Sequence, residues 1–369
     1  MNPTILPPPS PAQSPVKNPV APTPKPTVPS QPETPPKSKK PWLKLLLWST
    51  VAIIVIFMSV FIWFVMALSS VRADVPVDGK IIEVKAGTSL ENIADDLSSN
   101  NLITDKNVFV FWAKFGPARG RLQPGPYLIK PTSSIRQIVA DMSAGKIAIN
   151  KITFPEGITI NDMAKRWSAA GYGSKDEYIA ATKKLAINYA FIPAVAKDNP
   201  EGYLFPATYS FSPGSSAEVV VSKQYEAFKT QAEPLLQGAL PDGLTKHQVL
   251  TLASIVEREA LTATDRKLTA GVFLNRLRLG MKLESDVTVN YATGKTITSP
   301  GDLSVVSPYN TYIVRALPPT PINNPSTDSI EAVMGFTPSD YIFFLAGKDS
   351  KVYYAKTLSE HNENIKNHL

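Results

Sequence analysis

The chain has 369 residues, of which 43% are hydrophobic and 19% charged, so it can form two or three domains with buried cores. The formal net charge of +7 is modest and lies partly in the first forty residues. No basic stripe interleaved with aromatic residues follows, which argues against a nucleic-acid partner. The sequence has three histidines but no cysteine and no HExxH motif. We therefore expect neither a metal site nor a cofactor.

A proline-rich segment occupies residues 1–41, with PPP, TPKP and PETPP runs. Such a composition cannot bury enough apolar surface to fold, so we predict an extended, disordered tail. Its role has two open interpretations, a solvated tether and a docking site for a proline-reading partner.

A long apolar segment follows, LLLWSTVAIIVIFMSVFIWFVMAL from Leu45 to Leu68, which contains twenty-four residues without a charge. About twenty apolar residues cross the hydrocarbon core as a helix, so we predict a single transmembrane helix at residues 42–68. The alternative is a cleaved signal peptide. Its apolar region would be shorter and nearer the terminus, which favours a retained anchor here.

The charges that flank this helix predict its orientation. Four lysines lie between residues 37 and 44, whereas only Arg72 follows closely, and Asp74 balances it. The positive-inside rule then places the proline-rich tail in the cytoplasm. We therefore expect the chain after about Ser69 to lie outside the plasma membrane.

Two stretches beyond the membrane segment align at a constant offset of 70 residues. VKAGTSLENIADDLSSNNLITDKNVF begins at Val84, and FPEGITINDMAKRWSAAGYGSKDEYI begins at Phe154. In each stretch a strand runs into a glycine turn, at Gly87 and Gly157. A Ser or Thr then caps a helix with an apolar stripe. The sequence therefore predicts one small strand–helix unit that is used twice.

The first copy continues into LQPGPYLIKPTSSIRQIVADMSAGK, in which a Gly-Pro turn precedes a strand and another amphipathic helix begins near Ser133. This βααβ arrangement resembles a LysM module, a common small binder of glycans that contain N-acetylglucosamine. We therefore predict a LysM-like module at residues 69–150. Glycan binding and a simple spacer role both remain open for it.

The segment HQVLTLASIVEREA, which begins at His247, predicts a helix whose apolar stripe ends in an acid. Glu259 shares a face with Ile255 and Val256, whereas Glu257 lies about 200° around the helix axis. Burial beside an apolar face raises the pKa of a carboxyl group and keeps a proton available for general acid catalysis. The alternative is a structural Glu259 that is paired with an arginine such as Arg258 or Arg266.

Six blocks occur in order along the rest of the chain: EGYLFPATYSF, LASIVEREA, DRKLTAGVFLNRLRLGMKLESDVTVNYA, SPYNTY, ALPPTPINNPS and KTLSEHNENI. Together they resemble the endolytic murein transglycosylase family (YceG-like), and the resemblance covers about Gly79 to the C-terminus. It implies a mixed α+β catalytic domain at residues 151–369, and hence an α+β fold for the whole chain. It also implies lytic cleavage between N-acetylmuramic acid and N-acetylglucosamine of nascent glycan strands, which leaves 1,6-anhydro ends.

The resemblance places the catalytic glutamate in the helix that reads ASIVEKE in the family. We align its last acid with Glu259 and keep Glu257 as the second candidate. One glutamate would protonate the glycosidic oxygen and then take the proton of the sugar's C6 hydroxyl. The sequence departs from the family at Val287, where proline is usual, and at Ala316, where glycine is usual, which bears on loop shape.

The blocks also supply hydroxyls, amides and aromatic rings typical of saccharide clefts. The candidate substrate-binding residues are Asn275, Asp286, Thr288, Tyr291, Tyr309, Asn310 and Tyr312. Expected partners are peptidoglycan strands and the membrane, with peptidoglycan synthases as further candidates. Two other functions remain open, a hydrolysing muramidase that uses Asp286 as its second carboxylate and a wall-binding scaffold without activity.

Overall fold

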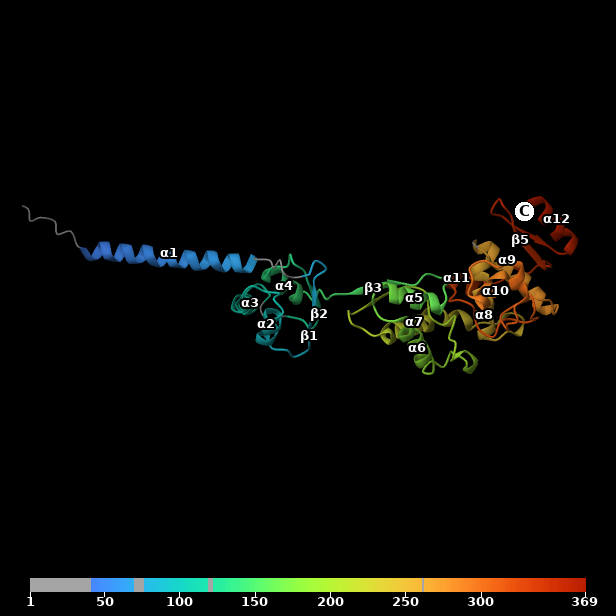
Figure 1. Cartoon of the computed structure of the whole chain (residues 1–369), viewed down its shortest axis with the longest axis horizontal. Helices are drawn as coiled ribbons and strands as arrows, with labels where there is room; N and C mark the ends of the chain where they lie inside the picture. Colours follow the sequence, from blue (N-terminus) through green and yellow to red (C-terminus); the bar gives the residue numbers. More distant parts are fainter. Residues whose placement is uncertain (1–40, 70–75, 119–121, 261) are drawn as a thin grey trace, which may run out of the picture. The chain divides into compact units, whose positions relative to one another are not determined.

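The structure, a computed structural model, describes residues 41–69, 76–118, 122–260 and 262–369 (Figure 1). The predictions for the proline-rich tail, and for Arg72 and Asp74 in the outer flank, lie outside the described residues. The chain divides into two compact units, residues 1–62 and 63–369.

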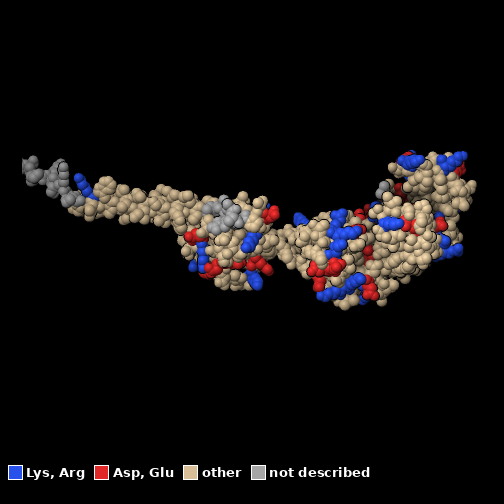
Figure 2. Space-filling view, in the orientation of Figure 1, with Lys and Arg blue, Asp and Glu red and all other residues tan. Residues whose placement is uncertain are grey.

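Helix α1 (Pro41–Ser69) forms from the long apolar segment. Residues 42–69 have a mean hydropathy of 2.9 in their most apolar window, and the helix is long enough to cross a bilayer. Figure 2 shows a surface without charged side chains along this helix, except near its N-terminal end. The predicted apolar helix is therefore present, with bounds within one residue of those expected.

The next elements are β1 (Lys80–Val84), α2 (Leu90–Ser99), α3 (Lys106–Phe115), β2 (Gly125–Ile129) and α4 (Ile135–Ser143). Strands β1 and β2 pair antiparallel, with Ile82 opposite Tyr127. The helices cover this pair and close a hydrophobic core that includes Phe109 and Met142. Leu68, in the last turn of α1, is only 2% exposed and belongs to the same core.

The same order of elements returns in β3 (Asn150–Thr153), α5 (Ile160–Ala169), α6 (Lys175–Ala186), β4 (Thr208–Phe211) and α7 (Ala217–Gln231). Strands β3 and β4 again pair antiparallel. Helices α2 and α5 begin and end 70 residues apart. In each, the side chain of the N-cap Ser or Thr accepts a hydrogen bond from the third backbone amide of the helix. The predicted repeat is confirmed at matched positions, and it extends further than expected, through the second strand and the last helix.

The glycine turns of the two copies also match. Gly87 has φ +80° and Gly157 has φ +69°, a region that is costly for residues with a Cβ atom. The turn thus requires glycine in both copies. The likeness of the first copy to a LysM module stays a prediction.

The remaining helices are α8 (Lys246–Glu259), α9 (Ala263–Arg278), α10 (Asp286–Thr293), α11 (Thr327–Met334) and α12 (Leu358–His368). Strands β5 (Phe343–Ala346) and β6 (Val352–Ala355) form a third antiparallel pair. Short 3₁₀ turns lie at Ala194–Ala196, Glu233–Leu236, Pro241–Gly243 and Pro300–Ser304. The mixed α+β class is confirmed.

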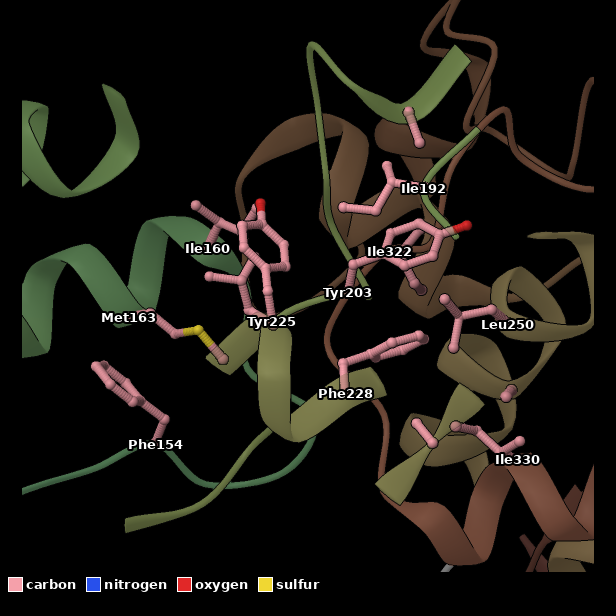
Figure 3. Packing of buried hydrophobic residues seen from close by; sticks show 14 of the residues in the cluster. Phe154, Ile160, Met163, Ile192, Tyr203, Tyr225, Phe228, Leu250, Ile322 and Ile330 are labelled. Atoms are coloured by element: carbon pink, nitrogen blue, oxygen red, sulfur yellow. The ribbon is translucent and has the colours of Figure 1, made fainter. Parts of the chain in front are cut away.

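A second hydrophobic core joins the repeat unit at residues 150–231 to helices α8, α9 and α11. Figure 3 shows how Phe154 and Met163 pack on one side of α7, with Tyr225 and Phe228 between them and Leu250 of α8. All five side chains are at most 2% exposed. Because burial of such side chains is the main source of stability, this core fixes α8 in place.

Candidate active site

Helix α8 carries the two candidate glutamates at its C-terminal end. Thr245 and Gln248 form a capping box that starts the helix, and Leu252, Ile255 and Val256 are fully buried along it. The helix ends at Glu259, after which Ala260 is extended. The negative end of the helix dipole therefore lies beside the Glu259 carboxyl and disfavours its charged form.

The Glu259 side chain keeps some exposed surface, while its carboxyl group is enclosed by protein. This desolvation is the main reason that the pKa of Glu259 is raised, and the nearby Asp286 charge raises it further. The Ser285 hydroxyl donates a 2.5 Å hydrogen bond to Oε1 and, together with Arg258, acts in the opposite direction. The net result is a carboxyl group that holds its proton to higher pH than an exposed glutamate does.

Ser285 occupies the N-cap position of α10, where a Ser side chain ordinarily accepts an amide of the first turn. Here it makes no capping bond, because its hydroxyl is directed to Glu259 instead. Loss of an N-cap hydrogen bond lowers the stability of a helix by about 0.5–2 kcal/mol. Helix α10 is therefore less stable than it would be with a capping bond, and Ser285 instead contacts Glu259. Ser285 is not among the residues predicted from the sequence, although its position just before α10 is a usable signal.

The backbone around Ser285 is held firmly. Its amide donates to Thr311 Oγ1 at 3.0 Å, and its carbonyl accepts from Thr288 Oγ1 at 2.7 Å. The preceding residue, Glu284, has φ +55°, a conformation that is strained for a residue with a side chain. Arg276 holds that turn, because its guanidinium donates to two backbone carbonyls and to the Glu284 carboxylate.

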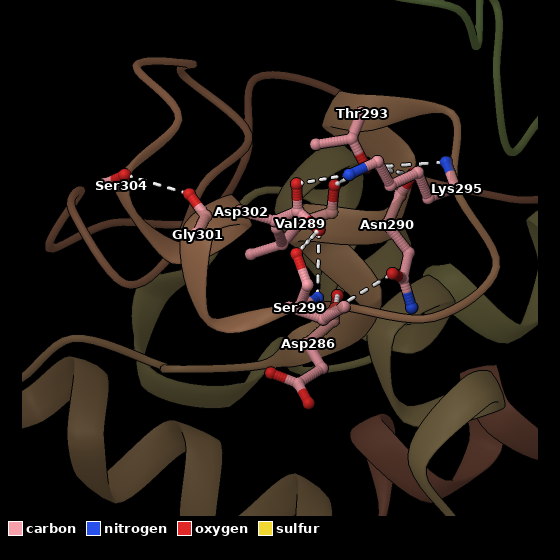
Figure 4. Close-up of polar contacts among 10 residues, drawn as sticks. Asp286, Val289, Asn290, Thr293, Lys295, Ser299, Gly301, Asp302 and Ser304 are labelled. Atoms are coloured by element: carbon pink, nitrogen blue, oxygen red, sulfur yellow. Dashed lines mark hydrogen bonds and ion pairs between the residues drawn. The ribbon is translucent and has the colours of Figure 1, made fainter.

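Asp286 is the first residue of α10 and supplies a second carboxylate near Glu259. The Tyr312 hydroxyl donates to its Oδ1 at 2.7 Å. In Figure 4 the Asp286 carboxyl points away from the contacts that join Lys295, Ser299 and Asp302. Two candidates from the sequence, Asp286 and Tyr312, thus lie near Glu259. Thr288 is fully buried, and its hydroxyl bonds to the Ser285 carbonyl and the Thr311 hydroxyl instead.

Glu257 binds a different part of the fold. Its Oε2 accepts from the Ser326 amide at 2.9 Å and from the Ser326 hydroxyl at 2.5 Å. Ser326 is the N-cap of α11, where a carboxylate is favoured by the helix dipole. Glu257 therefore joins α8 to α11, and the two glutamates face different partners, as the helical spacing predicts.

The other candidates divide between a cavity and the loops. Tyr291 and Tyr309 line a cavity of about 790 Å³, with ring centroids 4.9 Å apart. Asn275 donates to the carbonyls of Ser339 and Tyr341, and the fully buried Asn310 donates to those of Leu303 and Val305. These two amides are already occupied by backbone, so the structure does not bring them to Glu259.

A further acid, which is not among the residues predicted from the sequence, lines the same cavity. Glu201 is 3% exposed, and its Oε1 accepts from the Ile160 amide at 2.9 Å and from Asn324 Nδ2 at 2.8 Å. Burial raises the pKa of Glu201 to about 8. Its signal in the sequence was an acid at the head of the otherwise apolar block EGYLFP.

The alternative in which Glu259 is paired with an arginine does not describe this site. Arg266 lies 3.5 Å from Asp328 Oδ2, and Arg258 donates to the Gly157 carbonyl at 3.4 Å. A desolvated glutamate beside a second carboxylate and several hydroxyls is instead typical of the active site of an acid–base enzyme that acts on saccharides.

The chain belongs to the YceG-like family, whose sequence profile matches residues 82–367. The resemblance drawn from the six sequence blocks is thereby confirmed. A Bacillus subtilis protein named endolytic murein transglycosylase is 32% identical over 302 residues, which cover 76% of this chain and 82% of that protein.

A Streptococcus pneumoniae (strain D39) protein of the same name is 30% identical over 321 residues. The match covers 78% of this chain and 58% of the relative, so the chain spans little more than half the length of that protein. Among solved structures, a YceG-like protein from Listeria monocytogenes is 34% identical. The match covers 77% of this chain and 98% of the Listeria chain, with a TM-score of 0.49.

Proposed function

We propose that the protein is a membrane-anchored lytic transglycosylase, a lyase that cleaves the bond between N-acetylmuramic acid and N-acetylglucosamine in nascent peptidoglycan strands. The observation that carries the proposal is the Glu259 carboxyl, desolvated at the end of α8 and bound by Ser285. Relatives that share this family bear the name endolytic murein transglycosylase, which supports the same substrate class.

The reaction needs one carboxyl group that acts twice. Protonated Glu259 gives its proton to the glycosidic oxygen while the C1–O bond breaks, which leaves an oxocarbenium-like muramic acid. The Glu259 carboxylate then takes the proton of the C6 hydroxyl as O6 bonds to C1 and closes the anhydro ring. Ser285 favours the carboxylate between these steps, because its hydrogen bond stabilises the charged form.

Asp286 supports a second candidate, a muramidase that uses water. A hydrolase of this kind needs two carboxyl groups, and Asp286 lies near enough to raise the pKa of Glu259. Tyr312, hydrogen-bonded to Asp286, and the buried Thr288 are proposed to position the sugar or its loop in either reaction. The two reactions leave different ends on the cleaved glycan.

Mass analysis of the glycan ends decides between them. Purified protein should convert peptidoglycan strands to products whose new muramic acid ends are one water lighter than reducing ends. Reducing ends would instead establish hydrolysis, and an absence of new ends would favour the scaffold without activity.

The domain organisation is proposed as a tail at 1–41, a membrane helix at 42–68, a LysM-like module at 69–150 and a catalytic domain at 151–369. Two separate hydrophobic cores support the boundary near residue 150, because one ends at Met142 and the other begins at Ile152. For the module we propose contact with the glycan, and peptidoglycan synthases remain candidate partners.

The proposed location is the plasma membrane, crossed once, with the tail in the cytoplasm and the catalytic part outside. The four lysines between residues 37 and 44 support this orientation. A reporter that works only in the cytoplasm should be silent when fused after Lys130 and active when fused just before Trp42. Activity at the first site would reverse the orientation.

A further inference from the structure

The cavity of about 790 Å³ lies next to Glu259 and its neighbours Ser285 and Asp286, and residues of helix α10 contribute to both places. At the start of this helix, Ser285 donates a hydrogen bond to Glu259, and the Asp286 charge raises the pKa of Glu259. Val287, Asn290 and Tyr291, which share one helical face, line the cavity. One short helix therefore connects the reacting carboxyl to a second binding space.

Both charge signs surround this cavity. Lys165, Lys183, Arg258 and Lys295 line it, together with Asp162, Asp198 and Glu201. Figure 2 likewise shows basic and acidic side chains close together on the surface over α5, α6 and α7. A neutral glycan strand does not require such charges, so their arrangement bears on what else the cavity binds.

Two of the cations are already neutralised. Lys165 lies 2.9 Å from Asp162, and Lys295 lies 2.6 Å from Asp302 (Figure 4). Lys183 and Arg258 have no carboxylate within ion-pair distance among the residues that the structure describes.

The acids leave an excess of positive charge. The raised pKa of Glu201, about 8, leaves that acid largely protonated at neutral pH. Asp162 is paired with Lys165, so Asp198 is the remaining acid of the lining, and it has no ion-pair partner among the described residues. The cavity therefore carries two free cations against one free carboxylate, which suits a ligand with carboxylate groups.

Peptidoglycan offers such a ligand in the peptide stem that each muramic acid carries. If a muramic acid reacts at Glu259, its stem begins at the reacting sugar. The α10 positions Asp286 and Tyr291 are separated by about 7.5 Å along the helix axis. An extended peptide covers that span in about two to three residues. The carboxylates of the stem can thus reach the cavity from the cleavage site.

We propose that the cavity binds the peptide stem of the peptidoglycan strand through its carboxylates, with Lys183 and Arg258 as the charge partners. The inference rests on the proposed transglycosylase function and adds a part of the substrate to it. Tyr291, Tyr309 and Ile322 supply the rings and apolar surface against which the side chains of the stem pack.

The test compares two substrates with the full-length protein in detergent. One is a set of glycan strands with intact stems, and the other is the same set after an amidase has removed the stems. Wild-type protein should cleave the intact strands with a kcat/KM higher by about two- to fivefold, mainly through a lower KM, as expected for an exposed charge pair. Lys183→Gln should reduce that difference, because Arg258 remains, and leave cleavage of stripped strands unchanged.

Lys184 provides the matched control. It is the neighbouring exposed lysine of α6, it pairs with Glu218 at 2.6 Å and it does not line the cavity. Lys184→Gln should therefore keep the preference for intact strands, whereas Lys183→Glu should weaken cleavage of intact strands below that of stripped ones.

Equal cleavage of both substrates by wild-type protein would overturn the inference and leave the proposed function intact. So would an equal effect of Lys183→Gln and Lys184→Gln. Failure to cleave either substrate would overturn the proposed function and the inference together.

Discussion

The Glu259→Gln protein should fold normally and form no detectable 1,6-anhydro ends. The amide is nearly isosteric with the carboxyl, and its oxygen can still accept the Ser285 hydroxyl bond. It cannot donate a proton to the glycosidic oxygen at neutral pH. General acid–base catalysis contributes about 10²- to 10⁴-fold, and one residue that serves both steps should reach the upper end of that range. Mass analysis of strand ends measures the loss.

Glu257→Gln is the matched comparison, two residues away on the same helix. One amide oxygen can still accept from Ser326, so the main loss is a charge at the N-terminus of α11, which is worth about 0.3–1 kcal/mol of stability. Activity should stay near the wild-type value. An inactive Glu257→Gln protein beside an active Glu259→Gln protein would show that the catalytic residue is assigned two positions too late.

The division between these glutamates was predictable from sequence, because helical periodicity is a local property. Residues two apart lie on different faces whatever the rest of the chain does, and Ile255 and Val256 mark the buried face. The repeat was predictable for a similar reason. Strand, glycine turn and capped helix each carry a short-range signal, and all three recur at the same offset.

The contacts of polar side chains were not predictable in this way. Asn275 has the composition of a saccharide-binding residue, yet its amide is bound by carbonyls 64 and 66 residues further along the chain. Ser285 has the position of a helix cap but serves Glu259, 26 residues away. Only the tertiary fold decides which distant group satisfies a buried amide or hydroxyl.

Glu201 has one feature that the sequence shows and one that only the tertiary fold decides, and its substitution should change the stability of the protein strongly. An acid near an apolar block is visible in the sequence, but its hydrogen-bond partner Asn324 lies 123 residues away along the chain. That burial raises its pKa from 4.5 to about 8, so the folded protein holds a proton that the unfolded chain releases. The associated stability is complete below about pH 4.5 and is lost as the pH rises through about 8.

The Glu201→Gln protein should not lose this stability. In the wild type both the Ile160 amide and Asn324 Nδ2 donate to Oε1, which the glutamine oxygen can replace, and its NH₂ group then faces the Tyr291 hydroxyl. The two proteins should be about equally stable near pH 4.5. By pH 8 the variant should be more stable by about 4 kcal/mol, since each pKa unit is worth about 1.4 kcal/mol.

Amide hydrogen exchange of α5 and α8 in the full-length protein, compared between wild type and variant at each pH, measures this difference. The comparison at equal pH cancels the intrinsic pH dependence of exchange and the titration of every other group. Protection should diverge steadily between pH 5 and 8, with the variant better protected. Parallel curves would mean that Glu201 is already ionised in the folded protein. A carboxylate could remain charged there only if the Ile160 amide and Asn324 compensated its burial in full.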